Sequence, residues 1–190
     1  MLDLGCGPGT FMGLLPDAIQ ATGIDSAPEQ IWYANRQYGG PSRFFRTGDV
    51  SALDFPDGHF DIVTCMELLE HLPYGKALQM LQEARRVLKP DGRLLLTTPD
   101  YRSLWPVVEW CLNRLGPVSY ADAHILKCDR IVLGTLLQKA GLRSVLVENF
   151  QGMAAFGALL HWQLADLLAR GAASPGKNRS GLLLYAEGRP

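Results

Sequence analysis

A glycine-rich turn directly after a short apolar run constrains the fold of this 190-residue chain more than any other feature. Residues 1–4 (MLDL) have the composition of a strand, and residues 5–9 (GCGPG) follow at once. Glycines let a ligand approach the backbone closely, and the amides that begin the next helix have no partner within that helix. A strand, a glycine loop and a helix in this order are typical of nucleotide-binding α/β proteins.

Short β-rich runs alternate with longer helical patterns along the rest of the chain, which predicts an α/β fold with a mainly parallel sheet. We expect strands over residues 1–4, 20–24, 43–46, 60–65, 93–98, 142–147 and 182–186. We expect helices over residues 28–38, 74–88, 131–140 and 153–170, with a further short helix within 101–124. Residues 89–92 (KPDG) predict a turn, and residues 171–180 predict a flexible connector. Because a long connection precedes the last strand, we expect that strand to be antiparallel.

Charge and cysteine usage exclude several classes of function. The formal net charge is −1 and no lysine or arginine run is present, so the sequence does not suggest nucleic-acid binding. No apolar stretch reaches the ~20 residues of a membrane span, and no signal peptide is recognisable. Cys6, Cys65, Cys111 and Cys128 show neither a CxxC pair nor zinc-ligand spacing, so we expect reduced thiols, no metal and a soluble cytoplasmic protein.

The spacing of the glycines narrows the ligand. Gly5, Gly7 and Gly9 follow the pattern GxGxG, whereas the dinucleotide fingerprint is GxGxxG. Asp3 puts a carboxylate beside the loop, where it would repel a pyrophosphate and attract a cationic sulfonium ligand with an amino group. The alternative interpretation is an ordinary glycine-rich turn.

Two more aspartates follow predicted strands. Asp25 is placed to accept hydrogen bonds from ribose hydroxyls, or else to cap the helix that begins near Pro28. We assign the cap to Ser26 and the ribose to Asp25. Asp49 is placed to meet an adenine edge, although a turn aspartate explains it about as well on local grounds.

The order of five motifs resembles the class I S-adenosylmethionine (SAM)-dependent methyltransferases, and within them the small-molecule branch called type 11, which includes quinone-biosynthesis O-methyltransferases. The motifs are LDLGCGPG at 2–9, GID at 23–25, GDV at 48–50, FDIVTCMELLEHL at 60–72 and LKPDGRLLLTTP at 88–99. The resemblance is close over residues 1–99 and looser beyond them.

The resemblance implies a Rossmann-like seven-stranded sheet with an antiparallel last strand, helices on both faces, and SAM as cofactor with S-adenosylhomocysteine (SAH) as product. It also implies roles for individual residues. Gly5, Cys6 and Gly7 would line the methionine moiety, Asp25 would hold the ribose, Asp49 and Val50 would flank the adenine, and Met66 would lie beside the cofactor. With Asp3 and Ser26 added from the reasoning above, the cofactor-binding candidates are Asp3, Gly5, Cys6, Gly7, Asp25, Ser26, Asp49, Val50 and Met66. His71 would face the site of methyl transfer, and His124 lies where the family has a histidine before a substrate-side helix.

Methyl transfer needs a general base only when the acceptor must lose a proton. His71 and His124 are the catalytic candidates, each with a purely structural alternative, and Glu67 and Glu70 could orient a substrate. The apolar segments 103–115 and 153–168 predict an acceptor pocket, a cover for the sheet or a homodimer contact.

We therefore expect one methyltransferase domain over residues 1–190, with a cofactor half at 1–99 and a substrate side at 100–190. Its substrate would be a small-molecule acceptor. The alternatives are a SAM-binding domain without catalysis and, less favoured, a nicotinamide-dependent oxidoreductase. The family usually has a helix before the first strand, and this sequence starts within the strand, so we expect that wall of the pocket to be missing.

Overall fold

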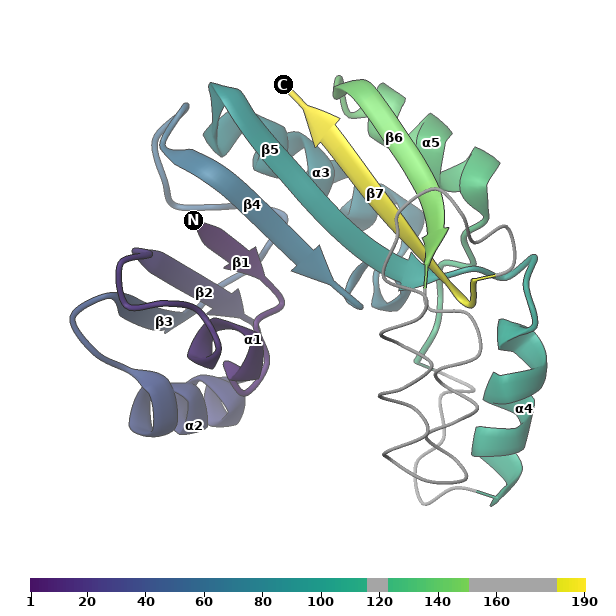
Figure 1. Cartoon of the computed structure of the whole chain (residues 1–190), viewed down its shortest axis with the longest axis horizontal. Helices are drawn as coiled ribbons and strands as arrows, with labels where there is room; N and C mark the ends of the chain where they lie inside the picture. The colour runs from purple at the N-terminus through teal and green to yellow at the C-terminus, as the bar shows by residue number, and fades with distance from the viewer. Residues whose placement is uncertain (116–122, 151–180) are drawn as a thin grey trace.

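The computed structural model describes residues 1–115, 123–150 and 181–190, and within these ranges one seven-stranded sheet has the order β3-β2-β1-β4-β5-β7-β6 (Figure 1). The strands are β1 (Leu2–Leu4), β2 (Ala21–Asp25), β3 (Arg43–Thr47), β4 (Phe60–Met66), β5 (Leu88–Pro99), β6 (Arg143–Phe150) and β7 (Leu183–Arg189). Neighbours from β3 to β5 are parallel, whereas β7 runs antiparallel to both β5 and β6. The predicted fold class and the antiparallel last strand are confirmed.

The described helices match most of the predicted ones. They are α1 (Thr10–Gly13), α2 (Pro28–Tyr38), the 3-10 helix η1 (Leu69–His71), α3 (Tyr74–Val87), α4 (Trp105–Leu115) and α5 (Arg130–Lys139). The short helix expected within 101–124 is α4. The helix predicted at 153–170 and the connector at 171–180 lie outside the described residues. No helix in the described part of the chain is long and apolar enough to cross a membrane.

Two local predictions are wrong. Residues 89–92 do not form a separate turn but belong to β5, where Phe60 pairs with Leu88 and Ile62 pairs with Arg93. The extra residues of β5 are therefore absorbed as a bulge. Ser26 does not cap α2, because the residue before Pro28 is held extended and the helix can begin only at the proline.

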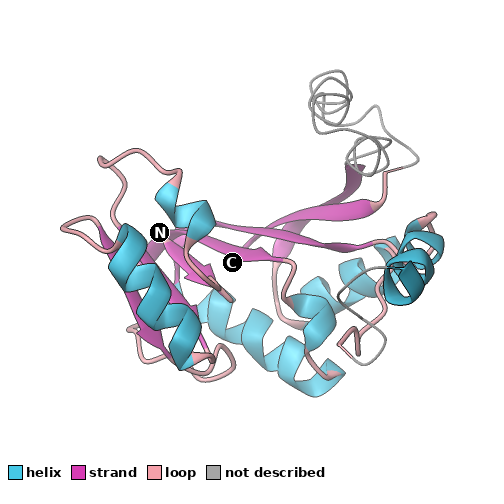
Figure 2. Ribbon diagram, turned by 90° about the horizontal axis from the view of Figure 1, so that it is seen from below, coloured by secondary structure: helices cyan, strands magenta, loops and turns pink. Residues whose placement is uncertain are grey.

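Helices pack on both faces of the sheet. Successive side chains of a strand point to opposite faces, so Ala21 and Ile24 of β2 belong to different buried clusters. The smaller cluster joins Ala21 to α1 and α2, whereas the larger one joins Ile24 to α3 and α5. In Figure 1, α3 and α5 lie behind β5, β7 and β6, and Figure 2 shows this helical layer beside the sheet.

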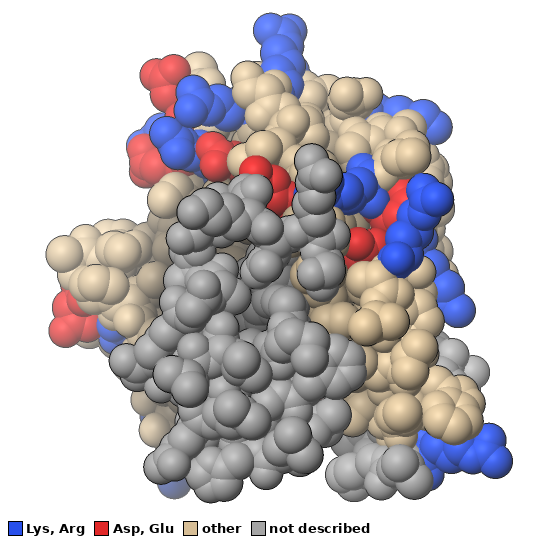
Figure 3. All heavy atoms as spheres, turned by 45° about the vertical axis from the view of Figure 1, so that its right-hand side comes forward, with Lys and Arg blue, Asp and Glu red and all other residues tan. Residues whose placement is uncertain are grey.

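The described surface carries charges of both signs. On the face in Figure 3, lysine and arginine side chains lie next to aspartate and glutamate side chains rather than in a basic patch of their own. This distribution agrees with the small net charge of the sequence.

Candidate functional site

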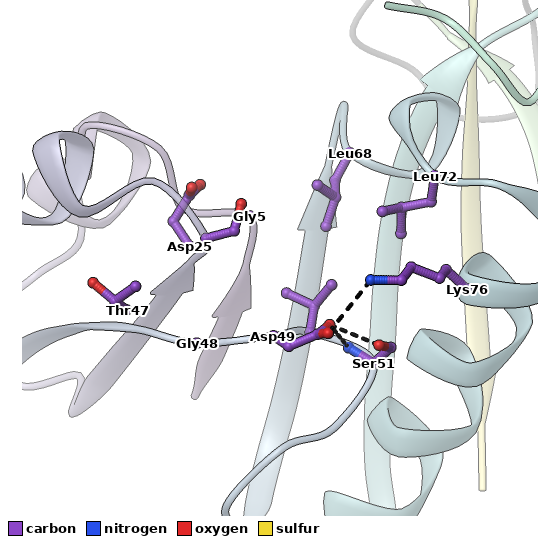
Figure 4. Close-up of a pocket in the computed structure, with 11 residues that line it drawn as sticks. Gly5, Asp25, Thr47, Gly48, Asp49, Ser51, Leu68, Leu72 and Lys76 are labelled. Carbon is purple, nitrogen blue, oxygen red and sulfur yellow. Dashed lines mark hydrogen bonds and ion pairs between the residues drawn. The ribbon is translucent and has the colours of Figure 1, made fainter.

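A cavity of about 270 Å³ opens beside the carboxyl ends of β1, β2 and β3 (Figure 4). The strand order changes direction at β1, and the crevice outside such a switch point is where open α/β sheets bind ligands. The lining residues are Gly5, Asp25, Ser26, Thr47, Gly48, Asp49, Val50, Ser51, Leu68, Leu72 and Lys76.

Gly5, the first residue of the glycine loop after β1, lines one side of this cavity. Gly5 and Gly9 have φ values of 68° and 78°, which residues other than glycine rarely adopt. A Cβ atom at Gly5 would also lie 2.9 Å from the side chain of Leu68. The amides of Gly5 and Cys6 both donate to the carbonyl of Ile24, so the loop is folded back onto the end of β2.

Asp25 ends β2 and organises the same wall. Its Oδ2 accepts a hydrogen bond of 2.9 Å from the amide of Gly7, and its Oδ1 accepts one of 2.9 Å from the amide of Ala27. The carboxylate is thereby fixed between the glycine loop and the start of α2. Each of its oxygens retains acceptor capacity toward the cavity, because a carboxylate offers about four lone-pair sites.

Asp49 reaches the cavity from the loop after β3. Its Oδ1 accepts hydrogen bonds from the amide and the hydroxyl of Ser51, at 2.8 and 2.6 Å. Its Oδ2 forms an ion pair of 3.5 Å with Nζ of Lys76, which extends from α3 across the opening (Figure 4). The hydrogen bonds from Ser51 lower the pKa of Asp49, so an ionised acceptor faces the cavity at neutral pH.

Asp3 lies beneath the cavity rather than on its wall. It is 3% exposed, and its Oδ1 accepts a hydrogen bond of 2.6 Å from the hydroxyl of Thr64 on β4. Burial raises the pKa of Asp3 to about 6. The carboxylate therefore takes up a proton more readily than an exposed aspartate does.

The predicted cofactor residues fall into two sets. Those that line the cavity are Gly5, Asp25, Ser26, Asp49 and Val50. Those that do not line it are Asp3, Cys6, Gly7 and Met66. The lining residues that were not predicted to bind the cofactor are Thr47, Gly48, Ser51, Leu68, Leu72 and Lys76. Leu68 and Leu72 flank η1 and belong to the motif at 60–72, whereas Lys76 lies on α3 outside any motif. Lys76 could not be identified from the sequence, because only the packing of α3 brings its side chain to Asp49 and the cavity.

The two predicted catalytic histidines lie close together although 53 positions separate them in the sequence. Their ring centroids are 5.0 Å apart in an edge-to-face arrangement. His71 is the last residue of η1, between the cavity-lining Leu68 and Leu72, and its Nδ1 donates a hydrogen bond of 2.9 Å to the carbonyl of Ala123. His124 is buried and contacts Glu109 of α4.

Glu70 lies with this histidine pair. Its Oε2 accepts a hydrogen bond of 2.9 Å from the hydroxyl of Thr98, and burial, with Glu67 nearby, raises its pKa to about 8. One donor atom from each of Glu70, His71 and His124 lies within 4.8 Å of the others, a composition able to hold a metal ion. The sequence shows no such cluster, because the third member is distant along the chain.

Comparison with known proteins connects this geometry to a family. A family model described as a methyltransferase domain matches residues 1–92. A ubiquinone biosynthesis O-methyltransferase of Pseudomonas aeruginosa is 33% identical over 176 residues, which cover 87% of this chain and 72% of that protein. The chain spans less than half the length of three further curated relatives that it matches.

Solved structures share the fold. A SAM-dependent methyltransferase of Thermotoga maritima, titled a possible histamine N-methyltransferase, has a TM-score of 0.72 at 18% identity, with 99% of this chain and 80% of that one covered. The magnesium protoporphyrin IX methyltransferase of Synechocystis, solved with bound SAH, has a TM-score of 0.64 at 19% identity, with 100% and 73% covered.

Proposed function

Because the chain belongs to the class I SAM-dependent methyltransferases, we propose that it transfers a methyl group from SAM to a hydroxyl group of a small-molecule acceptor. The observation that carries this proposal is the cavity at the ends of β1, β2 and β3, which is lined by the carboxylates of Asp25 and Asp49. The relatives named as ubiquinone biosynthesis O-methyltransferases support a hydroxyl acceptor.

The residues of the cavity fit the nucleoside part of SAM. Asp25 has acceptor capacity for ribose hydroxyls while its present hydrogen bonds keep it in place. Asp49, ionised and oriented by Ser51, suits the amino group of adenine, and Val50 and Leu72 supply apolar contact for the ring. Gly5 leaves room for close approach of a ligand to the backbone.

When bound, SAM supplies a methyl group on a positively charged sulfur, and the sulfur departs as a neutral thioether. The chain has to orient the acceptor, exclude water and receive one proton for each hydroxyl that is methylated. His71 is suited to receive it. Its Nδ1 donates to a carbonyl, so the lone pair of the neutral ring lies at Nε2.

Asp3 can stabilise the positive charge of the cofactor although it does not line the cavity. Its buried carboxylate lies under the glycine loop, and a cationic ligand above that loop would favour its ionised form. We assign it to electrostatic support of the cofactor rather than to direct contact. The amides of Cys6 and Gly7 fix the glycine loop to Ile24 and Asp25, and the sulfur of Met66, at the end of β4, accepts a hydrogen bond from Thr97. All three lie within two positions of a lining residue in the sequence but do not line the cavity themselves.

Two measurements test the proposal. Isothermal titration calorimetry with SAH should show one binding site, and the absence of heat at about 1 mM ligand would overturn the proposal. Transfer of the radiolabelled methyl group of SAM should then be measured with catechols, phenols and primary amines of matched size. We expect labelled phenol ethers. Labelling of the amines alone would disprove a hydroxyl acceptor while leaving the cofactor assignment intact.

A further inference from the structure

A glutamate, a tyrosine and a histidine form a compact hydrogen-bonded triad beside the proposed site of methyl transfer. Nδ1 of His124 lies 2.9 Å from Oε1 of Glu109 and 2.9 Å from the hydroxyl oxygen of Tyr101. The hydroxyl of Tyr101 donates a hydrogen bond of 3.0 Å to the same Oε1. Glu109 and His124 are both buried, at 9% and 8% exposure, so these contacts are shielded from water.

The protons of the triad can be assigned from its chemistry. A carboxylate oxygen accepts hydrogen bonds, so Oε1 of Glu109 accepts one from each of its two neighbours, Tyr101 and His124. Burial, together with Glu109, raises the pKa of Tyr101, and its phenol proton therefore stays in place at neutral pH. That one proton is directed to Glu109, which leaves the phenol oxygen an acceptor toward His124. Both partners of Nδ1 are then acceptors, and Nδ1 must carry the hydrogen.

We propose that Glu109 is a positioning residue, which holds His124 as the Nδ1–H tautomer so that Nε2 carries the basic lone pair. His71 has the same tautomer for a different reason, since its Nδ1 faces the carbonyl of Ala123. Two imidazoles with centroids 5.0 Å apart therefore have matched tautomers, each set by an acceptor on its outer side. This arrangement resembles the way outer carboxylates and carbonyls orient histidines in catalytic and metal sites.

The packing around His124 makes the orientation specific to Glu109. Trp105 of α4 stacks on its ring, with centroids 6.2 Å apart and planes inclined by 28°. Among the residues that the structure describes, the charged and titratable groups near His124 include Glu70, His71, Tyr101, Glu109 and Lys127. Among these neighbours Glu109 and Tyr101 contact Nδ1, and Tyr101 itself depends on Glu109 for its hydrogen bond. Loss of Glu109 should therefore remove one acceptor from Nδ1 and let the phenol proton of Tyr101 turn toward Nδ1, so that a hydrogen on Nδ1 is no longer required.

The experiment measures the tautomer directly in the protein without ligand. Long-range ¹H–¹⁵N NMR spectra of histidine-labelled protein distinguish a protonated Nδ1 from a protonated Nε2, and the His124 signals are identified by their loss in His124→Gln. The wild type should show Nδ1–H. Glu109→Met should abolish this single tautomer, whereas Glu109→Gln, which keeps an acceptor oxygen, should retain it. Tyr101→Phe keeps the contact with Glu109 and should also retain it.

The inference rests on the proposed function only for its catalytic consequence. There, Glu109→Met should lower kcat by about 10- to 100-fold with KM for SAM unchanged, and Glu109→Gln should recover much of that loss. A protonated Nε2 on His124 in the wild type overturns the inference whether or not any variant folds. An unchanged kcat in Glu109→Met overturns the positioning role of Glu109 in catalysis. Failure of the wild type to bind SAH instead overturns the proposed function and leaves the NMR result standing.

Discussion

The amide of Gly7 donates a hydrogen bond of 2.9 Å to Oδ2 of Asp25, so the carboxylate that ends β2 also fixes the loop that follows β1. The second oxygen of Asp25 is held by Ala27 at the same distance. One side chain thus joins the first two β–α connections of the sheet, and it does so on the wall of the cavity.

Asp25→Ala should therefore weaken SAH binding by at least about tenfold, because it removes the proposed ribose acceptor and loosens the glycine loop. Isothermal titration calorimetry gives the dissociation constant. Asp91→Asn, an exposed substitution on β5 that does not line the cavity, is the matched control and should bind as the wild type does. Affinity within about threefold of the wild type in Asp25→Ala would contradict the ribose assignment.

Asp49 should give the cavity a preference for adenine over hypoxanthine. An ionised carboxylate accepts from the amino group of adenine and repels the carbonyl oxygen at the same position of hypoxanthine. The wild type should bind SAH more tightly than S-inosylhomocysteine by about 10- to 100-fold. Asp49→Asn offers both a donor and an acceptor, and should reduce that ratio to a few-fold. If the ratio of the two affinities is the same in Asp49→Asn as in the wild type, Asp49 does not contact the adenine ring.

Arg86 should stabilise the segment that carries Asp49 to the cavity. From α3 its guanidinium donates to the carbonyls of Leu53 and Phe55 and forms an ion pair with Asp57. Arg86→Met leaves those carbonyls without their donor and should lower the free energy of unfolding by about 2 kcal/mol. Urea denaturation measures the change. The exposed neighbour Arg85 provides the comparison, and Arg85→Met should cost less than about 0.5 kcal/mol.

Asp3 should make stability depend on pH in the acidic range. Its pKa is about 6 in the folded protein and 3.8 as its ordinary value. The folded state thus binds more protons than the unfolded state between these values, and the free energy of unfolding falls as pH rises from about 4 to 6. Asp3→Asn should lack this loss in denaturant titrations from pH 4 to 7.

Thr64→Val offers a second variant for the same effect. It removes the hydrogen bond that lowers the pKa of Asp3, and should shift the loss of stability to higher pH. Identical pH profiles for the wild type and both variants would show that Asp3 does not titrate in this range.

Several parts of the fold follow from local sequence. The bounds of α2 were predictable because Pro28 fits the first turn of a helix and Gly39 follows its last residue. The β4 strand was predictable as a continuous β-rich run, and the positions of Asp25 and Asp49 followed from the strands that precede them. These features depend on residues close together along the chain.

Two local errors have a common origin. Residues 89–92 contain proline and glycine and predict a turn, but pairing with β4 draws them into β5. Ser26 is a good helix cap in isolation, but Pro28 and the bond from Ala27 to Asp25 fix the start of α2 beyond it. In both cases a longer-range or backbone constraint outweighs the local preference.

The sequence by itself determined the order of the strands along the chain, the glycine loop and the carboxylates that follow β2 and β3, because periodicity and turn chemistry are local properties. Only the tertiary structure decided that Lys76 reaches Asp49, that Asp3 is buried beneath the cavity, and that Glu109 and His71 meet His124. The pairs Lys76–Asp49 and Asp3–Thr64 are 27 and 61 positions apart, and Glu109 and His71 are 15 and 53 positions from His124. The contacts arise from the pairing of distant strands and from the packing of helices and loops against the sheet. Side-chain spacing along one element cannot specify such packing.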